Sequence, residues 1–153
     1  LSGNEDVPLK TWAATGFADF RLEEYDEFLK HNLVWSVYEL CTSQQLQTEG
    51  RVMGHCVFSY TDQCLRGATS IWSIRVLNPN DEEGIEKYVL TIAVDNAKRT
   101  VTQAAGKFNM NLNQKAKQEK KRRAGSLYVH LLRESGRVMR LWMDKVGLQR
   151  SGV

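Results

Sequence analysis

The sequence is poor in cysteine and proline and has no long apolar run, and each shortage excludes a class of protein. It holds three cysteines and two prolines in 153 residues. Three irregularly spaced cysteines, Cys41, Cys56 and Cys64, do not make a disulfide framework, and without a Cys-x2-Cys pair they do not favour zinc. No stretch approaches the roughly 20 apolar residues of a membrane-spanning helix, and the first residues lack the pattern of a signal peptide. We therefore expect a cytoplasmic protein with reduced thiols, no metal and no cofactor.

The charge is divided unequally along the chain. The net charge is +3, but residues 98–153 carry 14 basic and 3 acidic residues, whereas residues 1–97 carry 7 basic and 15 acidic ones. Such a chain can bind a polyanion with its basic half. Alternatively, its two halves can neutralise each other, within the fold or in a homo-oligomer.

The composition, 42% hydrophobic and 25% charged, is that of an ordinary globular domain. Residues 1–19 have little periodicity and are predicted to form an irregular arm, and residues 20–153 a single domain. Because the chain does not begin with Met, we expect a processed chain or part of a longer one. Apolar spacing predicts a short helix over residues 20–30 and composition a strand over 33–41.

The middle of the chain predicts two helices followed by strands. Thr42 and Gln45 have capping-box spacing, so a helix should begin there and end near Gly50, and a second should run from about Gly54 to Gly67. Residues 69–76 alternate as a strand, and strands are also predicted over 88–94 and 99–103. Residues 114–147 are rich in helix formers and predict one or two helices. The predicted class is α+β, a small antiparallel sheet packed by helices with a helical C-terminal region.

His55 and Cys56 stand side by side where the second of these helices is predicted to begin. A cysteine in the first turn of a helix has its thiolate favoured by the helix dipole, and a protonated neighbouring histidine adds to this effect. The pair therefore indicates a reactive thiol. The other interpretation is that Cys56 is a small buried hydrophobe and His55 a capping or core residue.

Polar motifs recur in a fixed order after this pair. The segment from Glu49 to Tyr60 is followed by Ser73-x-Arg75, then Thr91-Ile92, then Gln103-x-x-Gly106-x-x-Asn109. This series, over about residues 40–113, resembles the PcfJ-like family, with its pattern of EG-x-x-M-x-HCV-x-x-Y, a strand ending in Leu-Arg, a Thr-Ile-Glu strand and Q-x-x-G-x-x-N. The family occurs on conjugative plasmids, prophages and related mobile elements of bacteria. The resemblance implies mobile-element biology and no particular reaction.

The chain departs from that pattern at two positions. Ala93 stands where the family usually has an acidic residue, so a catalytic role of that carboxylate does not carry over. Gly54 stands where many members have a second histidine before the His-Cys pair, which argues against a mechanism that needs two adjacent imidazoles.

If the helix beginning at His55 lies across the strands, the motif residues can meet in one pocket. They suit papain-like thiol chemistry, a buried hydrogen-bond network, or a nucleotide pocket in which aromatic rings stack, amides read base edges and Arg75 contacts phosphate. Neighbours on one helix turn point about 100° apart, which counts against the thiol scheme. The candidate catalytic residues are His55, Cys56, Tyr60, Gln103 and Asn109, and the candidate binding residues are Ser73 and Arg75.

A basic run follows these motifs. It holds six cations and one acid, Glu119, within nine residues, so few i,i+4 ion pairs can form and self-repulsion favours an anionic partner. Nucleic acid is the expected partner, and an acidic protein surface, including residues 1–97 of another copy, is the competitor. A membrane is not expected, because the run has no apolar face. The run consists of Lys115, Lys117, Lys120, Lys121, Arg122 and Arg123.

The function predicted from these features is a nucleic-acid-associated accessory domain of a mobile genetic element, such as a conjugation or phage system, or of a host-defence system. Two alternatives remain open. One is an enzyme that uses the His55/Cys56 pocket for thiol or nucleotide chemistry, and the other is a protein-protein assembly module.

Overall fold

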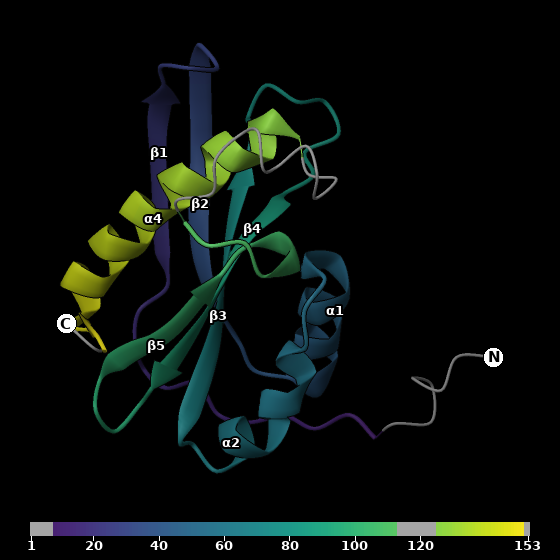
Figure 1. Cartoon of the computed structure of the whole chain (residues 1–153), viewed down its shortest axis with the longest axis vertical. Helices are drawn as coiled ribbons and strands as arrows, with labels where there is room; N and C mark the ends of the chain where they lie inside the picture. Colours follow the sequence, from purple (N-terminus) through teal and green to yellow (C-terminus); the bar gives the residue numbers. More distant parts are fainter. Residues whose placement is uncertain (1–7, 113–124, 152–153) are drawn as a thin grey trace.

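Six strands form one curled and mostly antiparallel sheet in the computed structural model, which describes residues 8–112 and 125–151 (Figure 1). The strands neighbour one another in chain order, and only the β5–β6 pair is parallel. The α+β class and the antiparallel sheet predicted from the sequence are therefore confirmed. The strands are β1 (Phe20–Asp26), β2 (His31–Leu40), β3 (Thr69–Leu77), β4 (Lys87–Asp95), β5 (Thr100–Ala105) and β6 (Gln149–Arg150).

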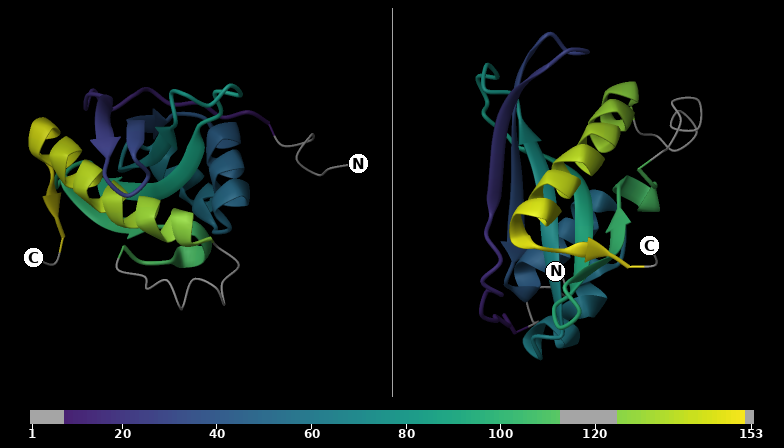
Figure 2. Two further views of the ribbon diagram at one scale, coloured as in Figure 1. Left: turned by 90° about the horizontal axis from the view of Figure 1, so that it is seen from above. Right: turned by 90° about the vertical axis from the view of Figure 1, so that its left-hand side faces the viewer.

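One long helix and a group of shorter ones pack on the sheet. The long helix α4 runs diagonally across one side of the sheet, with β6 returning from its end to pair with β5 (Figures 1 and 2). Of the predicted helical region 114–147, residues 114–124 lie outside the described residues, and α4 confirms a helix in the rest. The helices are α1 (Ser43–Met53), the 3-10 turn η2 (Val57–Tyr60), α2 (Thr61–Leu65), the 3-10 turn η3 (Lys107–Asn109) and α4 (Ser126–Val146).

None of the helices in the described part of the chain combines the length and the apolar character that crossing a bilayer requires.

Strand alternation gives the sheet two different faces. Trp72 and Ile74 point to the α4 side, where they join Trp35 and Trp142 in the larger core. Ile71, one residue away in the same strand, points to the α1 side and packs in a smaller core. The alternation predicted for residues 69–76 is confirmed, and it places Ser73 and Arg75 on the α1 side.

Helix α1 begins where the capping box predicts. The Thr42 hydroxyl accepts a hydrogen bond from the Gln45 N–H at 3.0 Å, and the Gln45 side chain accepts one from the Cys41 N–H at 2.7 Å. The predicted end near Gly50 is wrong, because the helix continues to Met53 and ends at Gly54, whose φ is 69°. Gly50 serves close packing instead: a Cβ atom there would lie 2.7 Å from the His55 carbonyl oxygen.

Residues 20–30 form strand β1 and a turn, so the predicted helix there is wrong. β1 pairs in register with β2 from Phe20↔Val37 to Asp26↔His31. The alternation of β1 is hidden in the sequence because two of its inward positions hold the acids Glu24 and Asp26. The cross-strand hydrogen bonds with β2 then outweigh the weak helical spacing.

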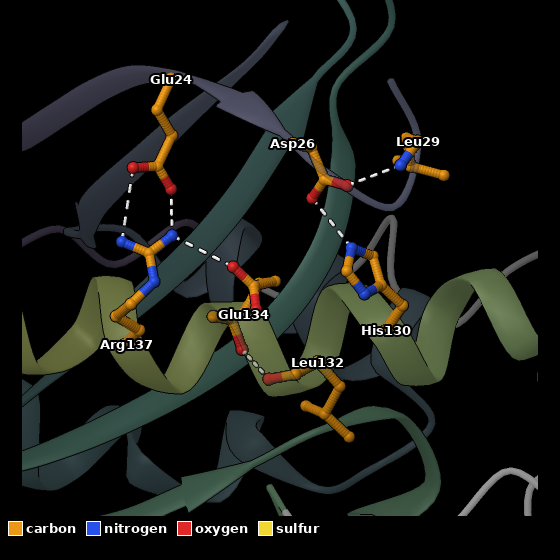
Figure 3. A network of polar contacts seen from close by, with 8 residues as sticks. Glu24, Asp26, Leu29, His130, Leu132, Glu134 and Arg137 are labelled. Carbon is orange, nitrogen blue, oxygen red and sulfur yellow. Dashed lines mark hydrogen bonds and ion pairs between the residues drawn. The ribbon is translucent and has the colours of Figure 1, made fainter. Parts of the chain in front are cut away.

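The inward-facing acids of β1 are accommodated because they have partners on α4. Asp26 accepts a hydrogen bond from the Leu29 N–H at 2.8 Å and lies 2.8 Å from Nε2 of His130, and Glu24 binds Arg137 (Figure 3). Burial pushes the pKa of Asp26 upward, but the hydrogen bonds from His130 and Leu29 outweigh it and hold that pKa below its ordinary value. These contacts tie the β1–β2 hairpin to α4.

The described part of the N-terminal arm, residues 8–19, runs along the junction of β2 and α1. The Trp12 N–H donates to the Cys41 carbonyl at 3.1 Å, and the Ser43 N–H donates to the Lys10 carbonyl at 2.8 Å. The division of the chain into an arm and one domain stays a prediction.

Candidate functional site

A pocket of about 550 Å³ opens on the α1 side of the sheet. Its walls come from the turn after α1, from η2, from β4 and β5, and from η3. The structure brings together here all five residues predicted as catalytic, which are spread over more than fifty positions of the sequence. They are His55, Cys56, Tyr60, Gln103 and Asn109.

Two glycines shape the turn that carries His55 to the pocket. Gly50 lets the chain after α1 fold back against the helix, and the His55 N–H donates to the Gly50 carbonyl at 3.1 Å. Gly54 adopts the left-handed conformation, and a Cβ atom there would lie 2.7 Å from the ring of Phe108. The spacing of Gly50 and Gly54 before His55 therefore has a steric cause.

The helix predicted over residues 54–67 is wrong in this segment. Cys56 has φ −97° and ψ 63°, which is not helical, and η2 and α2 follow as two short separate turns. Cys56 is therefore not in the first turn of an α-helix, and the dipole argument for its thiolate does not apply. Its side chain is exposed, and the His55 ring nitrogen Nε2 is hydrogen-bonded to Thr91 rather than to the thiol.

The other two cysteines are unreactive in this environment. All three are free, with Cys41 half-buried and Cys64 buried. Burial raises the pKa of Cys41 and of Cys64 to about 11 each, with the Glu39 charge adding to the effect. Both remain thiols at neutral pH.

His55 is linked to a buried carboxylate through one hydroxyl. Its Nε2 lies 3.1 Å from Oγ1 of Thr91, and the Thr91 hydroxyl donates to Oε2 of Glu49 at 2.6 Å. Glu49 is fully buried and comes from the inner face of α1. Burial lowers the pKa of His55, with a smaller opposing effect of its own carbonyl, so the ring is neutral at physiological pH.

Glu49 is the site residue that sequence reasoning missed. Its other oxygen, Oε1, lies 3.7 Å from the Arg75 guanidinium and is the sole buried side-chain nitrogen or oxygen of the described residues without a hydrogen-bond partner. Burial raises the pKa of Glu49 although Thr91, Ser73 and Arg75 oppose the rise. The available signal was its spacing: Glu49 shares the buried face of α1 with Leu46 and Met53.

Ser73 and Arg75 lie behind the pocket and do not line it. The Arg75 Nε donates to the Ser73 hydroxyl at 3.1 Å, and its guanidinium carbon lies 4.1 Å from the Tyr88 ring centre and 5.4 Å from that of Tyr38. Arg75 thus serves as the counter-charge of Glu49 between two aromatic rings. The expected role of Arg75 in contacting a phosphate in the pocket does not fit this placement.

Gln103 and Asn109 present amides at the pocket rim. The Tyr60 hydroxyl donates to Oε1 of Gln103 at 3.0 Å, which leaves the NH₂ group of Gln103 for a ligand. Asn109 stands in the left-handed conformation with φ 61°, which asparagine tolerates better than most residues. Both side chains are exposed. The rim therefore offers hydrogen-bond donors at two points.

The basic run from Lys115 to Arg123 lies outside the described residues. Its two flanks are described: Asn109 of η3 is six residues before Lys115, and Gly125, just before α4, is two residues after Arg123. The flanks meet, because the Lys107 N–H donates to the Tyr128 hydroxyl at 2.6 Å. The described residues on either side of the run therefore meet beside η3, which forms one wall of the pocket.

No metal centre is evident, since residues 8–112 and 125–151 contain no cluster of three histidines, cysteines or acids placed to hold an ion.

Fold and site together define an α+β domain in which a glycine-shaped turn delivers a histidine to a polar pocket backed by a sheet. A model of the PcfJ-like protein family matches residues 21–120, and the chain belongs to this family. No curated protein and no solved structure matches it significantly.

Proposed function

We propose that this domain binds nucleic acid as an accessory module of a mobile genetic element or host-defence system. The observation that carries the proposal is the run of six cations in the sequence between η3 and α4, two elements that contact each other beside the pocket. Clustered cations with few acids bind phosphates by releasing counterions. Membership of the PcfJ-like family supports the mobile-element setting.

The test is binding of single- and double-stranded DNA and RNA across a salt series. If all six cations contact phosphates of a duplex, the logarithm of the binding constant should fall with the logarithm of salt concentration with a slope of about −5. Changing Lys120, Lys121, Arg122 and Arg123 to Glu should flatten this slope to about −2 or abolish binding. No binding by the wild type at physiological salt would overturn the proposal.

A matched control separates the run from net charge alone. Lys10, Lys30, Lys87 and Lys98 are exposed and lie elsewhere, and their change to Glu alters the net charge by the same amount. This control should keep most of the affinity at 150 mM salt, where charges more than about 8 Å apart are screened. Equal loss in both variants would show that only overall charge matters. Cys56→Ala should leave binding unchanged, whereas an enzyme using this thiol would lose its activity.

A further inference from the structure

The two edges of the sheet differ in how open they are to another strand. The sheet ends in β1 on one side and in β6 on the other (Figure 1). β6 has only two residues, and the β4–β5 ladder next to it contains a register shift. Short strands and irregular ladders are two ways in which proteins keep an edge from pairing with other chains. β1 has seven residues and pairs regularly with β2 along its whole length, so it has neither protection.

The backbone of β1 has free hydrogen-bonding groups on its outer side. Every second residue of an edge strand turns its N–H and C=O away from the neighbouring strand. Within the part of the chain that the structure describes, β2 is the only strand beside β1, and the outward backbone groups of residues 20–25 have no partner. Such an edge can accept an extended strand of another chain through main-chain hydrogen bonds.

The side chains of β1 decide which strand fits. Leu22 and Glu24 turn toward α4, whereas Arg21 and Glu23 are exposed on the other face. Neither Arg21 nor Glu23 forms an ion pair with another described residue, and Glu23 accepts only a long hydrogen bond from Asn32 at 3.4 Å. Charges on an edge strand normally oppose pairing. Pairing therefore requires a register that places opposite charges together.

Two copies of β1 have one such antiparallel register. When Leu22 faces Leu22 of the second copy, Arg21 lies opposite Glu23 and Glu23 opposite Arg21, which gives two ion pairs about the twofold axis. A shift by one residue would pair side chains of opposite faces. Every other shift that overlaps at least three residues of β1 places like charges opposite each other, which is destabilising. The opposed pairs would be Arg21 with itself, Glu23 with itself, Glu24 with itself, or Glu24 with Asp26.

We propose that two copies of this chain form a dimer through β1, antiparallel and with Leu22 at the twofold axis, so that their sheets become one continuous sheet. This register pairs residues 20–24 of one copy with residues 24–20 of the other. The contact uses the same edge on both copies, so the assembly closes at two and does not grow into a fibre. The proposal does not depend on nucleic acid, because the pairing residues lie in β1 alone.

The dimer is tested by sedimentation velocity of the whole chain, freed of nucleic acid, at concentrations up to about 1 mM. Arg21→Glu and Glu23→Arg each place like charges opposite each other at both ion pairs, and each should weaken dimerisation at least about tenfold. The double variant Arg21→Glu/Glu23→Arg exchanges the charges and should restore the dimer. Arg66→Glu makes the same charge change at an exposed position elsewhere and should have no effect. A wild type that stays monomeric, or a double variant that does not recover, would overturn the proposal.

The register is tested by cysteine cross-linking in a Cys56→Ser background, which lacks the exposed native thiol. Leu22→Cys should give a covalent dimer after oxidation by diamide, because Cβ atoms of directly opposite residues lie about 4.5 to 5.5 Å apart. Arg21→Cys is the matched control. Residue 21 and its copy are two positions out of register, about 7 Å along the strands, which is beyond the reach of a disulfide. Equal cross-linking at both positions would refute the register.

A second control distinguishes pairing through β1 from attraction between the acidic part of one copy and the basic run of another. The variant with Lys120, Lys121, Arg122 and Arg123 changed to Glu should dimerise as the wild type does. Loss of the dimer in this variant would show that the run holds the copies together and would overturn the proposal. A protein that dimerises but binds no nucleic acid would refute the proposed function and leave the β1 dimer standing.

Discussion

The two faces of the sheet bury different kinds of side chain. The α4 face buries an apolar core that contains Trp35, Trp72 and Trp142, and its ion pairs join β1 to α4 (Figure 3). The α1 face has a small apolar core and buries Glu49, together with the polar Ser73 and Thr91. Since buried apolar area stabilises a fold and buried charge does not, the α4 face supplies most of the stability.

The difference shows which face of the sheet can hold a polar pocket. A residue such as Glu49 persists in a small core only if the remaining structure supplies stability in excess of what its burial costs. The pocket and its polar network lie on the face that contributes less to stability, while both faces share strands β3 and β4. Variants of the two faces should therefore differ in what they disturb.

The largest effect on stability should come from the α4 face. Trp142 is fully buried, with its ring centre 4.7 Å from that of Trp72. Trp142→Ala should lower the free energy of unfolding by about 4 kcal/mol, because it leaves a large cavity. Urea unfolding measures this loss. Leu141→Ala, one residue away on the exposed side of α4, is the matched control and should cost less than about 1 kcal/mol. Equal losses would show that the core is not where the stability lies.

Breaking the polar network on the α1 face should cost less. Glu49→Ala leaves Arg75 without its counter-charge and Thr91 without its acceptor, and should cost about 3 kcal/mol. Glu49→Gln keeps an acceptor for Thr91 and should cost less than the alanine variant. The measurement is again urea unfolding, with Trp142→Ala in the same series. A stabilised Glu49→Ala variant would contradict the view that Arg75 depends on Glu49.

The same contrast explains how much of this structure the sequence predicts. β3 and β4 were predictable, because their inward and outward positions alternate cleanly. The start of α1 was predictable from the capping-box spacing of Thr42 and Gln45. β1 was mistaken for a helix because Glu24 and Asp26 occupy inward positions. Their partners on α4 are more than a hundred residues away, so no local pattern reveals them.

The residues of the site were predictable from the sequence, but the contacts between them were not. Ordered motifs placed His55 and Gln103 in one pocket, and the structure brings them together there. The sequence gives no sign that Arg75 turns away from the pocket toward Glu49, because the burial of that carboxylate depends on how α1 packs on the sheet. Gly50 was read as a helix end since local propensity cannot distinguish a stop from a close contact.

A smaller effect should come from the turn that positions His55. Gly54→Ala introduces a Cβ atom 2.7 Å from the Phe108 ring at a left-handed φ of 69°, and should cost about 2 kcal/mol. Gly67 has a similar φ of 74° with nothing within 4 Å of the added atom. Gly67→Ala therefore measures the backbone strain alone, about 1 kcal/mol.

The difference between these two variants isolates the contact with Phe108. Only Gly54→Ala should also shift the NMR signals of His55, because only that residue precedes it in the turn. Equal costs and unshifted His55 signals would mean that Phe108 moves aside freely and that the turn does not depend on this packing.

The smallest effects should appear in the pH dependence of stability, where the two faces differ in sign. Asp26, on the α4 face, has a lowered pKa in the folded protein, so its contribution is present at neutral pH and is lost as the pH falls through that value. Glu49, on the α1 face, has a raised pKa, so its burial costs stability at neutral pH and this cost is relieved as the pH falls through that raised value.

Two single substitutions separate these contributions. Asp26→Asn should make the loss of stability in acid less steep than in the wild type, whereas Glu49→Gln should make it steeper, because the variant lacks the gain that the wild type obtains from protonating this carboxyl. Urea unfolding between pH 3 and pH 7 measures both slopes. Slopes that change in the same direction would contradict the assignment of opposite electrostatic roles to the two faces.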